Sequence, residues 1–284
     1  MIRLILTKAN GYNQFKDDVM KQDDLIEKIK YTLQQNKDVR GAWLTGSFGR
    51  GDADQYSDVD VIVLIEDGRL DTIFSAFQQE INKISPILFS KTLSSSKTIN
   101  VITPEWQRFD LTFVSKLQLQ KMSADHLKAL FDRDAAGKAL PLSLEVESDL
   151  KPADLTNMVN EFLRILGLMP VVIGRKEYIV GQTGSNLLRD MLIKLMIYEN
   201  ASGPVRGALS LSRSLNEEQI EVLNNLPPLS ACKDAILTVN KEIAEDFLPR
   251  ARSMAQKIGA EWPEAFEAVT IEHLKKTLKL EIEF

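Results

Sequence analysis

Hydrophobic residues in the first half of the chain recur at two different spacings. Residues 21–37 and 69–83 carry apolar side chains three and four positions apart, which predicts an amphipathic helix over each segment. Pro104 and Glu105 separate two apolar runs and indicate a hairpin connection between them. Short runs rich in β-branched and other apolar residues predict strands at 41–45, 58–65, 97–103 and 108–114. The first half therefore combines strands with helices.

The second half of the chain shows only the helical spacing. Pro152 begins the first helical stretch, and Asp154 suits its N-cap because a side-chain oxygen there can accept a backbone N–H. Apolar stripes follow over 155–166 and 187–196. Further helices are predicted over 215–225, 230–258 and 263–280. Strands are not predicted anywhere in this half.

The change in pattern predicts two domains and an α+β fold class. Residues 1–140 would form a domain with a mixed β-sheet flanked by helices, and residues 150–284 a helical bundle. The boundary is placed in the segment 131–152. A chain of 284 residues is long enough for two ordinary domains, and 44% hydrophobic with 26% charged residues is a globular composition.

The composition and charge of the chain indicate its cellular location and the kind of partner that it binds. We find no apolar run of the ~18 residues that a membrane helix needs and no signal peptide, and the single cysteine, Cys232, cannot form an internal disulfide. A cytoplasmic location without membrane attachment is therefore expected. The net charge of −5 disfavours long nucleic acid as a partner and favours a small substrate, in particular a cationic one.

Chemistry concentrates between residues 46 and 60. Asp58 and Asp60 are two positions apart on a predicted strand, so their carboxylates point to the same face and repel one another unless a cation lies between them. The preceding strand ends at Gly46 and Ser47, where the missing side chain and the hydroxyl suit close contact with a phosphate. Arg50 follows and either contacts a triphosphate or is an exposed loop residue.

A third acid is expected, since two metal ions need more ligands than two carboxylates supply. Asp110 provides it, because it interrupts the apolar run at 108–114, where an aspartate without a partner is costly to bury. Gly46-Ser47, ten residues, Asp58-Val59-Asp60 and a later strand with Asp110 together resemble the DNA polymerase β nucleotidyltransferase superfamily. Within it, the chain resembles the lincosamide and aminoglycoside nucleotidyltransferases of antibiotic resistance.

The resemblance implies a reaction and a role for each matching residue. Gly46 and Ser47 would hold the triphosphate of ATP or another nucleotide, and Asp58, Asp60 and Asp110 would bind Mg²⁺. A substrate hydroxyl would attack the α-phosphorus and release pyrophosphate, with two metal ions stabilising the attacking and leaving oxygens. Some relatives use a separate glutamate as general base, and some build the site between subunits, which leaves a homodimer open.

Several assignments keep two interpretations. Glu105 and Glu177 are candidates for the general base, and Glu177 and Lys176 also for contacts with the acceptor or the triphosphate. The charged island that contains them, residues 175–177, is equally a loop between helices. Trp43 and Trp106 border the proposed site, and core packing is preferred over base stacking for each.

The acceptor is not fixed by the sequence. Transfer of a nucleoside monophosphate, AMP in the first place, to a hydroxyl of a small molecule such as a lincosamide or an aminoglycoside is the leading hypothesis. Transfer to a protein or an RNA end is an alternative, as is a non-catalytic, antitoxin-like module that only binds nucleotide. Intact Asp58, Asp60 and Asp110 argue against the last, since a binding module does not need all three.

Overall fold

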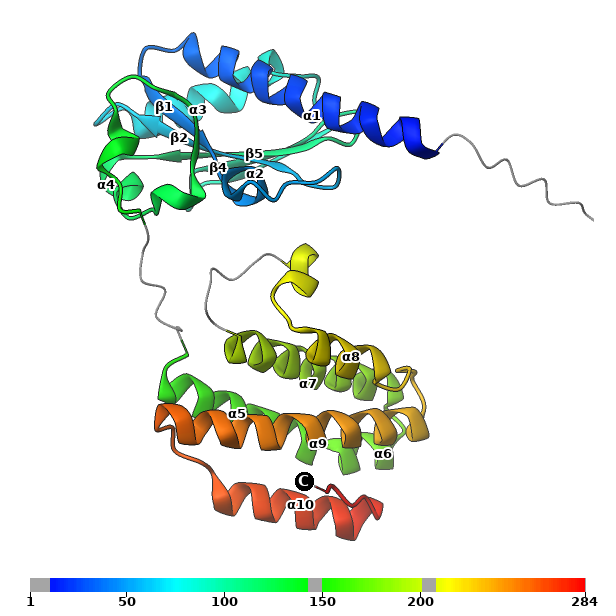
Figure 1. Ribbon diagram of the computed structural model, residues 1–284. Coiled ribbons are helices and arrows are strands. Elements are labelled where there is room, and N and C mark those ends of the chain that lie inside the picture. Colours follow the sequence, from blue (N-terminus) through cyan, green and yellow to red (C-terminus); the bar gives the residue numbers. More distant parts are fainter. Residues whose placement is uncertain (1–10, 143–149, 201–207, 284) are drawn as a thin grey trace, which may run out of the picture. The chain divides into compact units, whose positions relative to one another are not determined.

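The chain folds into two compact units, Met1–Glu145 and Val146–Phe284. The structure is a computed structural model, and it describes residues 11–142, 150–200 and 208–283 (Figure 1). The first unit holds all the strands of the described residues, and the second is helical. The predicted α+β class is confirmed.

One sheet organises the first unit. Its strands lie in the order β3-β4-β5-β2-β1-β6, and only β2 and β5 are parallel to each other. The strands are β1 (Val39–Leu44), β2 (Val59–Ile65), β3 (Phe89–Leu93), β4 (Thr98–Ile102), β5 (Arg108–Val114) and β6 (Lys128–Asp132). The mixed sheet expected from the sequence is therefore present, with β2 and β5 at its centre.

The two faces of the sheet carry different side chains. On one face, α1 (Gly11–Gln34) and α3 (Leu70–Glu80) cover alternate strand residues, and Phe77 and Phe113 pack there with ring centroids 5.3 Å apart (Figure 1). The opposite face has a smaller apolar cluster, which includes Trp43 and Ile62. Residues of β2 alternate between the faces, so Asp60 lies on the same face as Ile62 and away from α1 and α3.

Short helical segments complete the first unit. They include α2, a single turn between β1 and β2 that matters for the site below. Their bounds are α2 (Gly46–Arg50), η1 (Ile81–Lys83), α4 (Lys116–Leu119), η2 (Ala124–His126) and η3 (Ala136–Ala139). Asp132 at the end of β6 accepts backbone N–H groups of Ala136 and Gly137, so it is a turn residue.

The second unit is a bundle around one apolar core. Phe162 and Phe247 stack face to face at its centre, with ring centroids 3.9 Å apart, and both are fully buried. Its helices are α5 (Pro152–Gly167), α6 (Met169–Arg175), α7 (Tyr178–Glu199), η4 (Ala208–Arg213), α8 (Glu217–Asn225), α9 (Lys233–Ile258) and α10 (Glu264–Leu278). The spacing of apolar residues thus predicted helices where α5, α7, α8, α9 and α10 lie, whereas α6 and η4 were not predicted.

One segment of this bundle, Pro152–Arg175, is long and apolar enough to cross a membrane by length and composition alone. Polar residues are interspersed along it, so it contains no unbroken apolar run. In the structure it is two helices, α5 and α6, separated at Leu168. Five α5 side chains, Leu155 to Leu166 at helical spacing, are fully buried in the bundle core, which is the ordinary role of such a segment in a folded domain.

The structure differs from the sequence prediction at particular elements. Strands β3 and β6, the two edges of the sheet, were not predicted. None of their residues is buried, so they lack the apolar alternation of inner strands. The predicted N-cap at Asp154 is wrong. Helix α5 begins at Pro152 with Lys151 as N-cap. Asp154 lies in the first turn, where its negative charge interacts favourably with the helix dipole.

Candidate functional site

Two carboxylates stand at the start of β2, on the face away from α1 and α3. Val59, Val61 and Val63 of this strand are at most 1% exposed, while Asp60 between them is only half-buried. Asp58 immediately precedes the strand, two residues before Asp60, so both acids share one side of the chain. The alternation seen in the sequence thus turns the valines to the core and the acids to a common surface.

The third acid comes from the neighbouring parallel strand. Asp110 of β5 is the register partner of Asp60 in β2, and Val59 likewise pairs with Phe109. Partners in adjacent strands have backbones about 5 Å apart and side chains on the same face. The structure therefore brings together Asp58, Asp60 and Asp110 on one face at the amino-terminal ends of two central strands.

Burial and the neighbouring carboxylates raise the pKa values of two of these acids. Burial raises the pKa of Asp60 to about 6, and the Asp58 and Asp110 carboxylates add to the increase, while Arg50 and Arg108 oppose it. Burial also raises the pKa of Asp110, against the effect of its hydrogen bond from Asn100. Carboxylates that repel one another in a partly desolvated place are stabilised when a cation binds between them.

Gly46 lies directly against Asp60. Its φ is +60°, and a Cβ placed on it would come within 2.3 Å of Oδ2 of Asp60, so a side chain there would displace the carboxylate. The backbone N–H of Thr45 donates to the carbonyl of Asp60 at 2.9 Å and fixes this approach. Ser47 follows within α2 and is half-exposed.

Arg50 ends α2 and supplies positive charge near the acids. Its Nη2 lies 3.4 Å from Oδ1 of Asp52, and its Nε is buried without a hydrogen-bond partner among the described residues. The effect of Arg50 on the pKa of Asp60 places its guanidinium within electrostatic reach of that carboxylate. Arg50 is therefore not the freely exposed loop residue of the alternative interpretation.

The loop between α2 and Asp58 is tied down by hydrogen bonds. The carboxylate of Asp54 accepts the backbone N–H of Tyr56 at 2.9 Å and the Ser57 hydroxyl at 3.1 Å, as expected of a turn residue. Arg108, at the start of β5, donates a hydrogen bond of 2.9 Å to the carbonyl of Tyr56. These contacts hold the backbone just before Asp58 relative to the strand that carries Asp110.

Two residues near the acids were missed by the sequence reasoning. Asn100 of β4 donates from Nδ2 to Oδ2 of Asp110 at 2.5 Å, and Arg108 lies two residues before Asp110 on the same strand. A signal for Asn100 does exist in the sequence, because it is a polar residue between Ile99 and Val101. Its partner depends on the register between β4 and β5, which the sequence alone does not reveal.

The acids fit a divalent cation by their chemistry. Oxygen ligands are what Mg²⁺ prefers, and it is commonly held by one or two carboxylates together with substrate phosphates rather than by a complete protein cage. No preassembled group of three metal-binding side chains exists within the part of the chain that the structure describes. Asp58, Asp60 and Asp110 would hold the metal, with Gly46 and Ser47 next to the phosphates.

The remaining candidates lie outside this cluster. Glu105 and Trp106 are exposed in the turn between β4 and β5, and the expected core packing of Trp106 is wrong, since its side chain is 70% exposed. Trp43, in contrast, is 3% exposed and packs in the core as expected. Lys176 and Glu177, exposed between α6 and α7, belong to the second unit.

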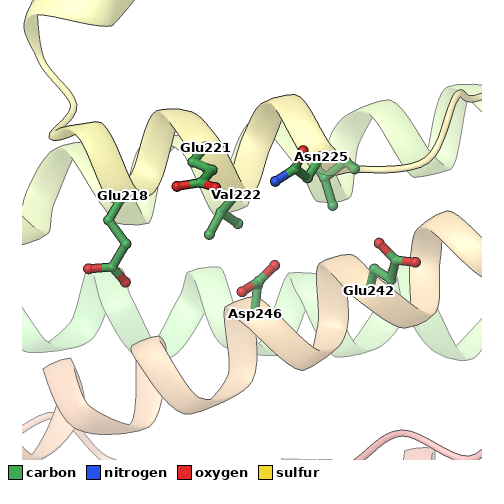
Figure 2. Close-up of a pocket in the computed structure, with 7 residues that line it drawn as sticks. Glu218, Glu221, Val222, Asn225, Glu242 and Asp246 are labelled. Carbon is green, nitrogen blue, oxygen red and sulfur yellow. The ribbon is translucent and has the colours of Figure 1, made fainter.

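The second unit has an acidic cavity of about 300 Å³ between α8 and α9. Figure 2 shows Glu218 and Glu221 of α8 facing Asp246 of α9. Burial raises the pKa of Asp246, with Arg250 opposing and Glu245 adding to the effect. The lining residues are Glu218, Glu221, Val222, Asn225, Leu226, Glu242 and Asp246. Arg250 partly balances this charge, with Nη2 at 3.5 Å from Oε1 of Glu218.

A family model matches part of the first unit. Residues 27–105 match the family model described as Polymerase beta, Nucleotidyltransferase. This segment runs from α1 to the turn before β5 and includes Gly46, Ser47, Asp58 and Asp60 but not Asp110. The resemblance read from the sequence is thereby confirmed for residues 27–105.

Solved structures of similar fold include several nucleotidyltransferases. An aminoglycoside 6-adenyltransferase from Bacillus subtilis is 13% identical, with a TM-score of 0.42, covering 89% of this chain and 95% of its own. A nucleotidyltransferase-like protein from Exiguobacterium sibiricum is 12% identical, with a TM-score of 0.37 and coverages of 95% and 89%. A STING-associated CdnE c-di-GMP synthase from Capnocytophaga granulosa is 13% identical, with a TM-score of 0.34 and coverages of 93% and 82%.

No match is found among curated proteins.

Proposed function

We propose that the chain is a Mg²⁺-dependent nucleotidyltransferase that moves a nucleoside monophosphate, AMP from ATP, to a hydroxyl of a small molecule and releases pyrophosphate. The observation that carries the proposal is the pairing of Asp60 with Asp110 across β2 and β5, with Gly46 packed against Asp60. The three acids and the close approach of the Gly46 backbone to Asp60 thus share one face of the sheet. That combination suits a nucleoside triphosphate.

The chain's own groups account for binding and orientation of the nucleotide. The amides of α2 and the hydroxyl of Ser47 would donate hydrogen bonds to phosphate oxygens, and Arg50 would add a positive charge beside them. Asp58 and Asp60 would hold Mg²⁺, which supplies charge neutralisation at the triphosphate when bound. Gly46 keeps the space between the phosphates and Asp60 free of a side chain.

The acceptor hydroxyl would attack the α-phosphorus while the bond to the bridging oxygen of pyrophosphate breaks. Its proton needs an acceptor, and we assign this role to Asp110, whose pKa is raised by burial, which makes its carboxylate a better base. Glu105 and Glu177 are the alternatives from the sequence. Glu105 lies exposed in the turn before β5, and Glu177 at the start of α7.

The acceptor class follows from charge. With a net charge of −5, the chain attracts cationic molecules and repels polyanions, so a small amine-bearing acceptor such as an aminoglycoside or a lincosamide is favoured over an RNA end. Antibiotic modification and a cytoplasmic location are parts of the same proposal.

An acceptor panel tests the proposal. The protein is incubated with Mg²⁺, each α-labelled nucleoside triphosphate and a set of aminoglycosides and lincosamides, and label transfer and pyrophosphate are measured. We expect acceptor-dependent transfer from ATP that Asp60→Asn abolishes and that the control Asp67→Asn, an exposed turn residue, leaves intact. Labelling of protein or RNA instead would establish the alternative acceptors. Nucleotide binding without turnover on any acceptor would identify a non-catalytic module.

A further inference from the structure

A row of polar side chains crosses three strands on the acid face. Asn100 of β4 is the register partner of Asp110 of β5, and Asp110 is in turn the partner of Asp60 in β2. Asp110 therefore has the amide of Asn100 on one side and the carboxylate of Asp60 on the other. All three side chains are half-buried.

The contact between Asn100 and Asp110 is specific to one carboxylate oxygen. Nδ2 of Asn100 donates to Oδ2 of Asp110 at 2.5 Å, and Oδ1 has no hydrogen bond to the described residues. A carboxylate only accepts, so the amide must turn its nitrogen toward Asp110, which fixes the orientation of both side chains. An amide holds the carboxylate without bringing a charge that would compete with a cation.

We propose that Asn100 is a positioning residue for the nucleotidyl-transfer site: it holds Oδ2 of Asp110 and leaves Oδ1 for the metal and the acceptor. The inference rests on the proposed function, because it requires that Asp110 works at a metal site. Removal of a residue that hydrogen-bonds to a metal-binding carboxylate commonly changes metal affinity or activity by 10- to 100-fold. A purely structural amide would change stability alone.

The next pair along the same two strands provides a matched control. Thr98 and Thr112 are register partners, and their hydroxyl oxygens lie 3.0 Å apart on the same face. Thr98→Val removes a cross-strand hydrogen bond between β4 and β5 but leaves Asp110 untouched. It therefore reports the effect of disturbing this strand pair without disturbing the carboxylate.

The experiment measures Mn²⁺ affinity by electron paramagnetic resonance on the full chain, in the presence of a non-hydrolysable ATP analogue. We expect Asn100→Leu to weaken Mn²⁺ binding at least 10-fold, to lower kcat and to leave the KM for ATP within about 3-fold, whereas Thr98→Val keeps the wild-type affinity. Asn100→Ala, which adds no apolar bulk, repeats the measurement if Asn100→Leu melts early.

The outcomes separate this inference from the proposed function. Wild-type Mn²⁺ affinity in both Asn100 variants would overturn the positioning role and leave the nucleotidyl-transfer site standing. Equal weakening in Thr98→Val would also overturn it, because the effect would then come from the strand pair as a whole. Failure of the wild-type chain to bind Mn²⁺ with the analogue would overturn both.

Discussion

Gly46 and Asp60 lie so close together that the space for a Cβ on Gly46 is already taken by Oδ2 of Asp60, at 2.3 Å. The end of β1 and the start of β2 thus meet without an intervening side chain, and the carbonyl of Asp60 accepts the N–H of Thr45 in the same region. This contact couples the turn that we propose to bind phosphate to the strand that we propose to bind the metal.

Gly46→Ala is expected to abolish nucleotidyl transfer while the protein still folds. The new methyl group displaces the Asp60 carboxylate, and the positive φ adds a strain of about 1 kcal/mol to the destabilisation. Gly51→Ala is the control, since its φ is +77° but nothing lies within 4 Å of the added Cβ. Thermal melts and label transfer for both variants check this. Full activity in Gly46→Ala would contradict the proposed geometry.

Asp60→Asn should make the metal-free protein more stable at neutral pH although it inactivates the site. Because the pKa of Asp60 is raised to about 6, the ionised carboxylate disfavours the folded state, by roughly 1–2 kcal/mol once solvent screening is included. Urea unfolding at pH 7 in the presence of a chelator measures the gain. A loss of stability would mean that the carboxylate has a stabilising partner in the protein.

Proton binding at Asp60 should make metal affinity depend on pH. The folded-state pKa lies above the ordinary value of 3.8, so the group favours folding at low pH, and this contribution is lost as pH rises through about 6. Mg²⁺ opposes the loss because it binds the ionised form. We expect calorimetric Mg²⁺ affinity to increase between pH 5 and 7 and then to level off. A Mg²⁺ affinity that does not change between pH 5 and 7 would count against Asp60 as a ligand.

The acidic cavity of the second unit predicts a second pH effect. Burial raises the pKa of Asp246, so its ionisation disfavours the folded bundle, and the penalty is present above its folded-state pKa and absent well below the ordinary value. Asp246→Asn should raise the melting temperature at pH 7 and have little effect near pH 3. Asp190→Asn, at an exposed position of α7, serves as the control with little effect at either pH.

The sequence predicted those parts of the site that depend on neighbours along the chain. Asp58, Asp60 and Gly46 belong to one short segment, and strand alternation is enough to place both acids on the same side. Asp110 was found because an acid within an apolar strand is unusual. Asn100 was not, because its contact arises from the register of two strands, which is set by the hairpin that joins them.

Exposure explains the other differences. Strands β3 and β6 are edges with no buried residues, so the periodic signal on which strand prediction depends is absent there. Trp106 was expected in the core because large aromatic residues usually are, yet it is exposed in a turn with a φ of +61°. The hydrophobicity of Trp106 does not predict the tight turn in which it lies.

The parallel pairing of β2 with β5 has a consequence for how the chain acquires its activity. Residues 61–109, which include α3, β3 and β4, must all be made and folded back before Asp110 can reach Asp60. Contacts of such long separation form late because loop closure precedes them. Divalent-metal binding would therefore appear only after β5 has paired with β2, and a nascent chain ending at Ile102 would still lack the site.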